Sequence, residues 1–233
     1  MQTVIAKARS LSQAGRVVTA VGVNAVLLGV IGHAFWLADW RYSLPTPRPA
    51  GLQQPPTGSR PSLPPALAGM RRGSRPLLIN FANPHCPCTE FNLDHLRKLQ
   101  QRYSGTVDFV TILESSADGT GAQREFQSMH LPMPMVYDPK GEVSASLGVY
   151  GTPQAVLLDG TGQLYFRGNY NRSRYCAEES SEFARIALDA LANGRALPAL
   201  PAVATIAYGC SLPRKPRPLA QAGTGGVGGG NLP

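Results

Sequence analysis

Residues 77–91 read LLINFANPHCPCTEF and combine three kinds of segment. An apolar run rich in branched residues, typical of a buried strand, ends in a short polar loop. Two cysteines, Cys86 and Cys88, stand one residue apart at the end of that loop. The amphipathic segment from Phe91 to Tyr103 is typical of a helix. The order predicts strand, loop and helix, with two thiols at the junction.

Pro87 determines where Cys86 lies relative to the predicted helix. Proline lacks an N–H and has φ fixed near the helical value, so it suits the first helical position and places Cys86 at the N-cap. The unpaired N–H groups there, with the positive end of the helix dipole, favour a thiolate. We therefore expect the pKa of Cys86 to lie below the usual value of about 8.5. The competing interpretation, two buried and inert cysteines, fits poorly with a helix start beside proline.

Composition restricts the folded part of the chain. Glycine and proline are concentrated before residue 76 and after residue 212. Such segments make poor cores, so we expect one domain at 76–212 and a disordered tail at 213–233. About 137 residues are enough to bury a core of their own.

The net charge of +8 comes from the flanks of the chain. Within residues 76–212, acidic residues outnumber basic ones. The domain lacks a basic face with interleaved aromatics, so nucleic acid is not an expected partner. The basic flanks are better suited to anionic lipid headgroups.

Residues 17–38 read VVTAVGVNAVLLGVIGHAFWLA, 22 positions without a charge. About 20 apolar residues cross a bilayer as a helix, so this is a predicted transmembrane helix. A cleaved signal peptide is disfavoured because bulky Phe35, Trp36 and Leu37 continue the apolar run after the small residues of Gly32–Ala34.

Basic residues precede the predicted span within residues 1–16. The positive-inside rule then places the N-terminus in the cytoplasm. We expect a single-pass protein of the inner (cytoplasmic) membrane with a periplasmic C-terminal domain. Residues 39–75 contain many prolines with scattered Gly, Ser and Arg, and predict an extended tether without a core.

The rest of the domain alternates strand-like and helix-like segments. They are predicted at 76–82 (strand), 87–103 (helix), 106–113 (strand), 122–129 (helix), 133–137 (apolar run), 142–147 (helical turn), 155–168 (hairpin) and 179–191 (helix). This order predicts an α/β fold, a mixed central sheet with helices on both faces.

Three features in this order resemble the thioredoxin-like superfamily, specifically its membrane-anchored redoxins of TlpA, ResA and RedB type. They are the cysteine motif that ends the first core strand, Gly151-Thr152-Pro153 before the next-to-last strand, and the hairpin AVLLDGTGQLYFRG at 155–168. The resemblance covers roughly residues 76–195.

The resemblance implies thiol-disulfide exchange with protein partners. It makes Cys86 and Cys88 the catalytic pair, without a cofactor. It also implies a cis peptide bond between Thr152 and Pro153, lying against the dithiol, where the Thr152 backbone receives an extended substrate strand.

The motif departs from the family, because a single residue, Pro87, separates the two cysteines where two residues are usual. A Cys86–Cys88 disulfide would close a small, strained and easily reduced ring. Cys176 and Cys210 offer other partners, and four cysteines allow three pairings. The pairing that we expect is Cys86–Cys88 with Cys176–Cys210, although Cys176 could instead resolve a mixed disulfide on Cys86.

Three other functions have to be weighed, and the first of them does not match the sequence. A peroxiredoxin would need Thr or Ser and proline upstream of the cysteine, where Asn83 and Ile79 stand. A copper-binding protein could use His85, Cys86 and Cys88 as Cu(I) ligands, since soft thiolates select that ion. A redox-inert adaptor domain would tolerate loss of Cys86.

Overall fold

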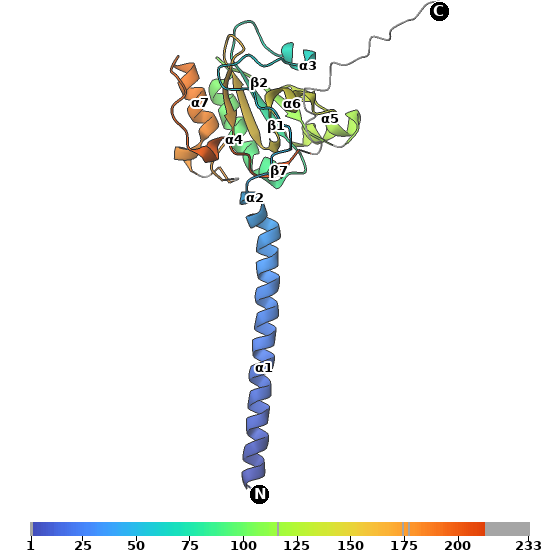
Figure 1. Ribbon diagram of the computed structural model, residues 1–233. Coiled ribbons are helices and arrows are strands. Elements are labelled where there is room, and N and C mark those ends of the chain that lie inside the picture. Colours follow the sequence, from blue (N-terminus) through green and yellow to red (C-terminus); the bar gives the residue numbers. More distant parts are fainter. Residues whose placement is uncertain (1, 116, 174, 177, 213–233) are drawn as a thin grey trace, which may run out of the picture. The chain divides into compact units, whose positions relative to one another are not determined.

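The computed structural model describes residues 2–115, 117–173, 175–176 and 178–212, and the chain divides into two units, Met1–Arg41 and Tyr42–Pro233 (Figure 1). The first unit is helical. Helix α1 (Gln2–Phe35) continues into a π-helical turn, η1 (Trp36–Trp40), and α2 (Arg41–Ser43) follows at the boundary.

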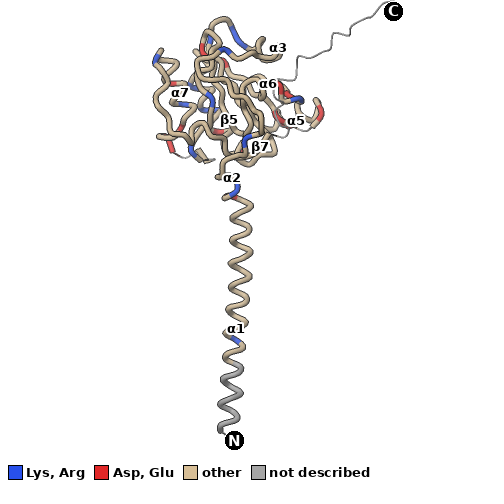
Figure 2. The backbone as a smooth tube through the Cα atoms, viewed as in Figure 1, with Lys and Arg blue, Asp and Glu red and all other residues tan. Residues whose placement is uncertain are grey.

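Within the described residues, one helical stretch, Gln13–Ser43, is long and apolar enough to cross a membrane, with a mean hydropathy of 1.9. Figure 2 shows the uncharged part of α1 as a continuous tan tube. The stretch predicted at 17–38 lies inside it, and its helical conformation is confirmed.

The second unit is built on a five-stranded sheet with the strand order β3-β2-β1-β5-β6. Its strands are β1 (Leu77–Ala82), β2 (Asp108–Leu113), β3 (Met135–Tyr137), β5 (Gln154–Leu158) and β6 (Leu164–Gly168). β1 pairs in parallel with β2 and antiparallel with β5, and β5 pairs antiparallel with β6. The predicted mixed sheet is therefore confirmed.

Helices cover both faces of this sheet (Figure 1). They are α3 (Pro65–Ala68), α4 (Pro87–Tyr103), α5 (Gly119–Ser128), α6 (Glu142–Leu147) and α7 (Phe183–Ala192). One apolar cluster joins α4, α5 and α7 to the sheet through Leu78 and Ala82 of β1. A second cluster joins α3 and α6 to Leu77, Ile79 and Phe81. The alternation along β1 thus buries it on both sides.

Several element boundaries differ from the prediction, by one to four residues, and the starts of β2 and α7 have a clear cause. β2 starts at Asp108 because Thr106 and Val107 donate their N–H groups to the Tyr103 carbonyl and close the end of α4. α7 starts at Phe183 because Glu179–Ser181 forms a 3₁₀ turn, η2, instead of the first helical turn.

The prediction that residues 39–75 form only a tether is wrong for much of that range. Leu67 is fully buried in the second cluster, and Leu52 packs against Tyr150. Backbone hydrogen bonds also join Gly58 and Ser59 to Leu164, with N···O distances of 2.7 and 2.8 Å. A few apolar residues between prolines are enough to fix an extended segment onto the sheet, although such a segment cannot form a core by itself.

The C-terminal extension also packs on the domain. Residues Ala202–Ala204 form a 3₁₀ turn, η3, whose Ala204 carbonyl accepts from the Asn169 N–H at 2.8 Å. The chain then enters β7 (Cys210–Ser211), which pairs antiparallel with β4 (Gly151–Thr152). The predicted tail at 213–233 lies outside the described residues.

Candidate redox site around Cys86

Cys86 lies at the start of helix α4, as predicted. It is the N-cap residue, with φ −92° and ψ 117°, and Pro87 holds the first helical position. Its own N–H donates to the Asn83 carbonyl at 3.0 Å, and its carbonyl accepts from the Thr89 N–H at 2.9 Å. The backbone therefore holds the Cys86 sulfur beside the N-terminus of α4, where negative charge is stabilised.

The Thr152–Pro153 peptide bond is cis, as the resemblance implied. Both residues are buried, and the Cys86 Sγ lies 3.5 Å from the Thr152 carbonyl oxygen. The loop before β5 and the start of α4 therefore lie next to each other, beyond the C-terminal end of the central strand β1.

The disulfide in the structure joins Cys86 to Cys210, and its Cα atoms are 5.9 Å apart. The expected pairing of Cys86 with Cys88 and of Cys176 with Cys210 is therefore wrong, and Cys88 and Cys176 carry thiols. The physical reason is the β4–β7 ladder, which places Cys210 directly opposite Thr152. Sequence spacing carried no information on this ladder, since 124 positions separate the two cysteines.

Gly209 allows the close approach of the C-terminal strand. Its φ is +102°, a conformation that residues with a side chain rarely adopt. A Cβ at this position would lie 2.5 Å from the Thr152 carbonyl oxygen and 3.4 Å from the Cys88 Sγ. Cys88 thus lies close to Gly209, the residue before Cys210.

The fourth cysteine, Cys176, lies on the same side of the domain. Its S–H donates to Asn92 Oδ1 of α4 at 3.3 Å. Burial raises the pKa of Cys176 to about 12, and the nearby charges of Glu182 and Cys88 act in the same direction. A thiol with this pKa is a poor nucleophile near neutrality, which disfavours Cys176 as the resolving residue.

A family model described as "Domain of unknown function (DUF6436)" matches residues 58–211. The chain belongs to the DUF6436 family. The matched range begins within the proline-rich segment and ends with the last residue of β7. It therefore includes both Cys86 and Cys210.

The DUF6436 chain also has distant relatives among thiol-disulfide interchange proteins. It is 30% identical over 97 residues to the Thiol:disulfide interchange protein DsbE of Yersinia pestis, covering 41% of this chain and 50% of that protein. It is 30% identical over 94 residues to the DsbE protein of Pasteurella multocida, covering 40% and 50%. The chain thus spans about half the length of these curated relatives.

Two solved structures are similar over most of the DUF6436 chain. A hypothetical protein of Sinorhizobium meliloti is 22% identical, with a TM-score of 0.57, and covers 70% of this chain and 96% of its own. An uncharacterised conserved protein of Geobacillus kaustophilus is 25% identical, with the same TM-score of 0.57, and covers 74% and 96%. The fold of the domain is thioredoxin-like, with one long apolar helix at the N-terminus.

The copper ligand set considered from the sequence is not brought together in the DUF6436 domain. The His85 side chain is 68% exposed, and its Nε2 lies 2.9 Å from Glu125 Oε1. Cys86 is committed to the disulfide. Among the described residues, no group of three or more His, Cys, Asp or Glu side chains is placed to hold a metal ion.

Two polar residues beside Cys176, Asn92 and Glu182, were not predicted from the sequence. Asn92 of α4 accepts from Cys176, and Glu182 lies 3.5 Å from His95 Nδ1. His95 is buried, at 8% exposed, and burial lowers its pKa although Glu182 opposes the shift. No motif marks these residues, and only the helical spacing of Asn92 from Cys88 hinted at a shared face.

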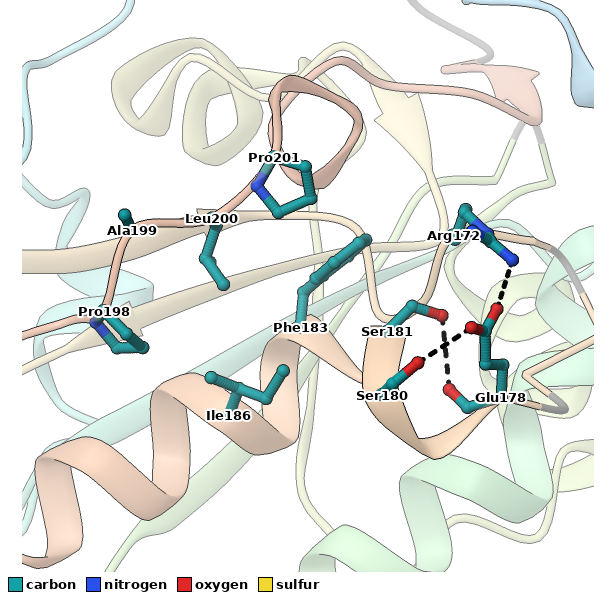
Figure 3. A pocket seen from close by; sticks show the side chains of 10 residues that line it. All are labelled: Arg172, Glu178, Ser180, Ser181, Phe183, Ile186, Pro198, Ala199, Leu200 and Pro201. Carbon is teal, nitrogen blue, oxygen red and sulfur yellow. Dashed lines mark hydrogen bonds and ion pairs between the residues drawn. The ribbon is translucent and has the colours of Figure 1, made fainter.

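A separate pocket of about 390 Å³ lies between α7 and the C-terminal extension (Figure 3). Phe183, Ile186 and Leu200 line its apolar part. At one end Arg172 forms an ion pair with Glu178, so these charges neutralise each other. Its lining includes no cysteine, and we assign it no part in the chemistry of the DUF6436 sulfurs.

Proposed function

We propose that this domain exchanges disulfides with partner proteins through Cys86 and Cys88. The observation that carries the proposal is the placement of a disulfide-forming cysteine at the N-cap of α4, 3.5 Å from the Thr152 carbonyl. The distant relationship to thiol-disulfide interchange proteins supports the same chemistry.

In the reduced protein, Cys86 is the nucleophile. The N-terminus of α4 stabilises its thiolate, which attacks one sulfur of a partner disulfide and releases the other as a thiolate. Cys88 then attacks the Cys86 sulfur of this mixed disulfide. A Cys86–Cys88 bond forms, the second partner thiolate leaves and takes a proton, and two electrons pass from the domain to the partner.

Thr152 and Pro153 position the partner in this proposal. The Thr152 backbone forms ladder hydrogen bonds with an extended segment, and the segment carries its cysteine to Cys86. No group outside the protein is required for the exchange, because thiols and disulfides supply all the electrons that move.

We further propose that the apolar stretch within Gln13–Ser43 anchors the protein in the inner membrane, with the N-terminus in the cytoplasm. The basic residues before this stretch support that orientation. The domain then lies on the periplasmic side, where the oxidising conditions allow Cys86–Cys210 to persist.

Variants of the full chain in which one cysteine at a time is replaced by serine test the proposed exchange. The reduced chain is expected to reduce a model protein disulfide catalytically, and Cys86→Ser to remove this activity to below about one part in a hundred. Cys88→Ser should accumulate the mixed disulfide on Cys86, whereas Cys176→Ser should retain activity. Unchanged turnover in Cys86→Ser would eliminate the proposal.

A further inference from the structure

The C-terminal strand occupies the position in which the proposed function places a partner peptide. β7 pairs antiparallel with β4, with Cys210 opposite Thr152 and Ser211 opposite Gly151. Its cysteine is covalently bound to Cys86. A substrate held in a mixed disulfide would have the same three elements: an extended backbone, a ladder with Thr152 and a bond to the nucleophile.

The residues on either side of this strand are firmly held. Before it, the Tyr208 hydroxyl donates to the Asn171 carbonyl at 2.6 Å. After it, Leu212 is 6% exposed and packs in the second apolar cluster. The strand itself is short and lies at the surface, since Cys210 is half-buried and Ser211 is exposed. Fixed ends and a covalent centre indicate a defined binding site for this segment.

We propose that residues 208–212 are an internal substrate of the redox site, which a dithiol protein or reductant displaces by reducing Cys86–Cys210. This inference rests on the proposed function and names its substrate class. The site binds an extended segment in which glycine directly precedes the reacting cysteine, and Gly209-Cys210-Ser211 is the resident example.

The glycine requirement follows from the geometry at Gly209. Any side chain there would place a Cβ 2.5 Å from the Thr152 carbonyl oxygen, well inside van der Waals contact. A backbone oxygen in a buried loop moves less easily than the end of a flexible side chain. A partner segment in the same register meets the same oxygen, so it also needs glycine at this position.

Displacement proceeds by two thiol-disulfide exchanges. Cys210 is half-buried whereas Cys86 is 1% exposed, so the incoming thiolate has better access to the Cys210 sulfur. A bond forms from the dithiol to Cys210, and Cys86 leaves as a thiolate that the N-terminus of α4 stabilises. The second thiol of the reductant then attacks the first, releases Cys210 as a thiol and closes the disulfide of the reductant. Two electrons have passed to Cys86 and Cys210.

Peptide capture by the full chain in detergent tests this inference. Every form in the test carries Cys88→Ser, so that the mixed disulfide on Cys86 is not resolved and accumulates. The probe is a labelled peptide with a Gly-Cys sequence, its cysteine activated as a thionitrobenzoate disulfide, and peptide mapping measures the label on Cys86. The oxidised parent chain, unchanged at residues 210 and 212, and its oxidised Cys176→Ser form, the matched control, should capture almost none. Cys210→Ser with Leu212→Ala, which removes both the covalent and the apolar attachment, should capture at least about tenfold faster. An Ala-Cys probe should react at least about fivefold more slowly than Gly-Cys.

The outcomes separate this inference from the function on which it rests. If the oxidised parent chain labels Cys86 as fast as the double variant, exchange stands and the internal substrate does not. If Gly-Cys and Ala-Cys probes react equally, the assigned substrate class is wrong. If the double variant leaves Cys86 unlabelled by either probe while iodoacetamide still alkylates it, the proposed exchange itself fails.

Discussion

At the scale of single residues, Gly209 determines how close the C-terminal strand comes to the redox site. Its positive φ excludes most side chains, and the short distance that would separate a Cβ there from the Thr152 carbonyl oxygen excludes them as well. Cys210 can reach Cys86 because the preceding residue fits between Thr152 and Cys88. The disulfide therefore depends on a residue that takes no part in its chemistry.

Gly209→Ala should make the Cys86–Cys210 disulfide easier to reduce. Alanine at positive φ costs about 1 kcal/mol or more in the closed form, and every 1.4 kcal/mol is about tenfold in an equilibrium constant. We expect the equilibrium constant for reduction by dithiothreitol to rise about tenfold, measured by trapping thiols at set dithiol ratios. Gly105→Ala is the control, because nothing lies within 4 Å of a Cβ there. Equal reduction of the two variants would contradict this assignment.

His95 should make stability depend on pH. Burial lowers its pKa in the folded protein from 6.5, so the unfolded chain binds more protons below that value. Its contribution is fully present above pH 6.5 and is lost as the pH falls through the folded pKa. Urea unfolding between pH 7.5 and 5.5 should show a decline of at most about 1.4 kcal/mol per pH unit.

His95→Gln serves as the comparison for this pH dependence. The other charged groups around this position, Glu182, Arg185 and Lys98, are retained in the variant. The difference between the two pH profiles therefore reports the histidine. Parallel profiles over this range would show that His95 is not responsible.

At the scale of elements, the segments with regular periodicity were predictable and those without it were not. β1, α4 and the β5–β6 hairpin carry apolar patterns that set their type and nearly their ends. Residues 46–75 and 196–212 carry no such pattern. Their positions depend on isolated apolar anchors and backbone hydrogen bonds to distant strands, and the Cys86–Cys210 bond depends on those positions.

Leu67 tests whether the proline-rich segment belongs to the domain. Its side chain is fully buried in α3 against the second apolar cluster. Leu67→Ala should lower the free energy of unfolding by about 2–5 kcal/mol. Leu44→Ala, at a side chain that is 42% exposed, should change it by less than about 0.5 kcal/mol. Chemical denaturation measures both changes. If Leu67→Ala leaves the free energy of unfolding unchanged, the proline-rich segment is only a tether, as the sequence predicted.

At the scale of the whole molecule, the N-terminal helical unit and the domain differ in composition, and we propose separate roles for them. Residues 17–38 of the helical unit carry no charged side chain, and this composition suits the proposed contact with lipid. The domain carries its own apolar core and all four cysteines of the chain. The sequence was sufficient to separate the two, because an uncharged run of this length has no place in a small soluble core.

Protease protection in spheroplasts tests the proposed topology. Added protease should remove the domain and leave a protected fragment that contains the N-terminal helix. In lysed cells, the chain should remain with carbonate-washed membranes, and removal of residues 2–41 should release it. A domain that is protected in intact spheroplasts would place the redox site in the cytoplasm.

Two backbone contacts join the beginning of the domain to the segment before its C-terminal strand. The Thr46 N–H donates to the Ala207 carbonyl at 2.7 Å, and Pro45 forms a β-bridge with Tyr208. A chain that loses its sulfur bond at residue 210 therefore also weakens the attachment of residues 45 and 46, just after the N-terminal helical unit. If the helical unit is the membrane anchor that we propose, reduction at this one covalent bond would lengthen the untethered chain between the anchor and the domain, and so widen the region that the Cys86 thiol can reach.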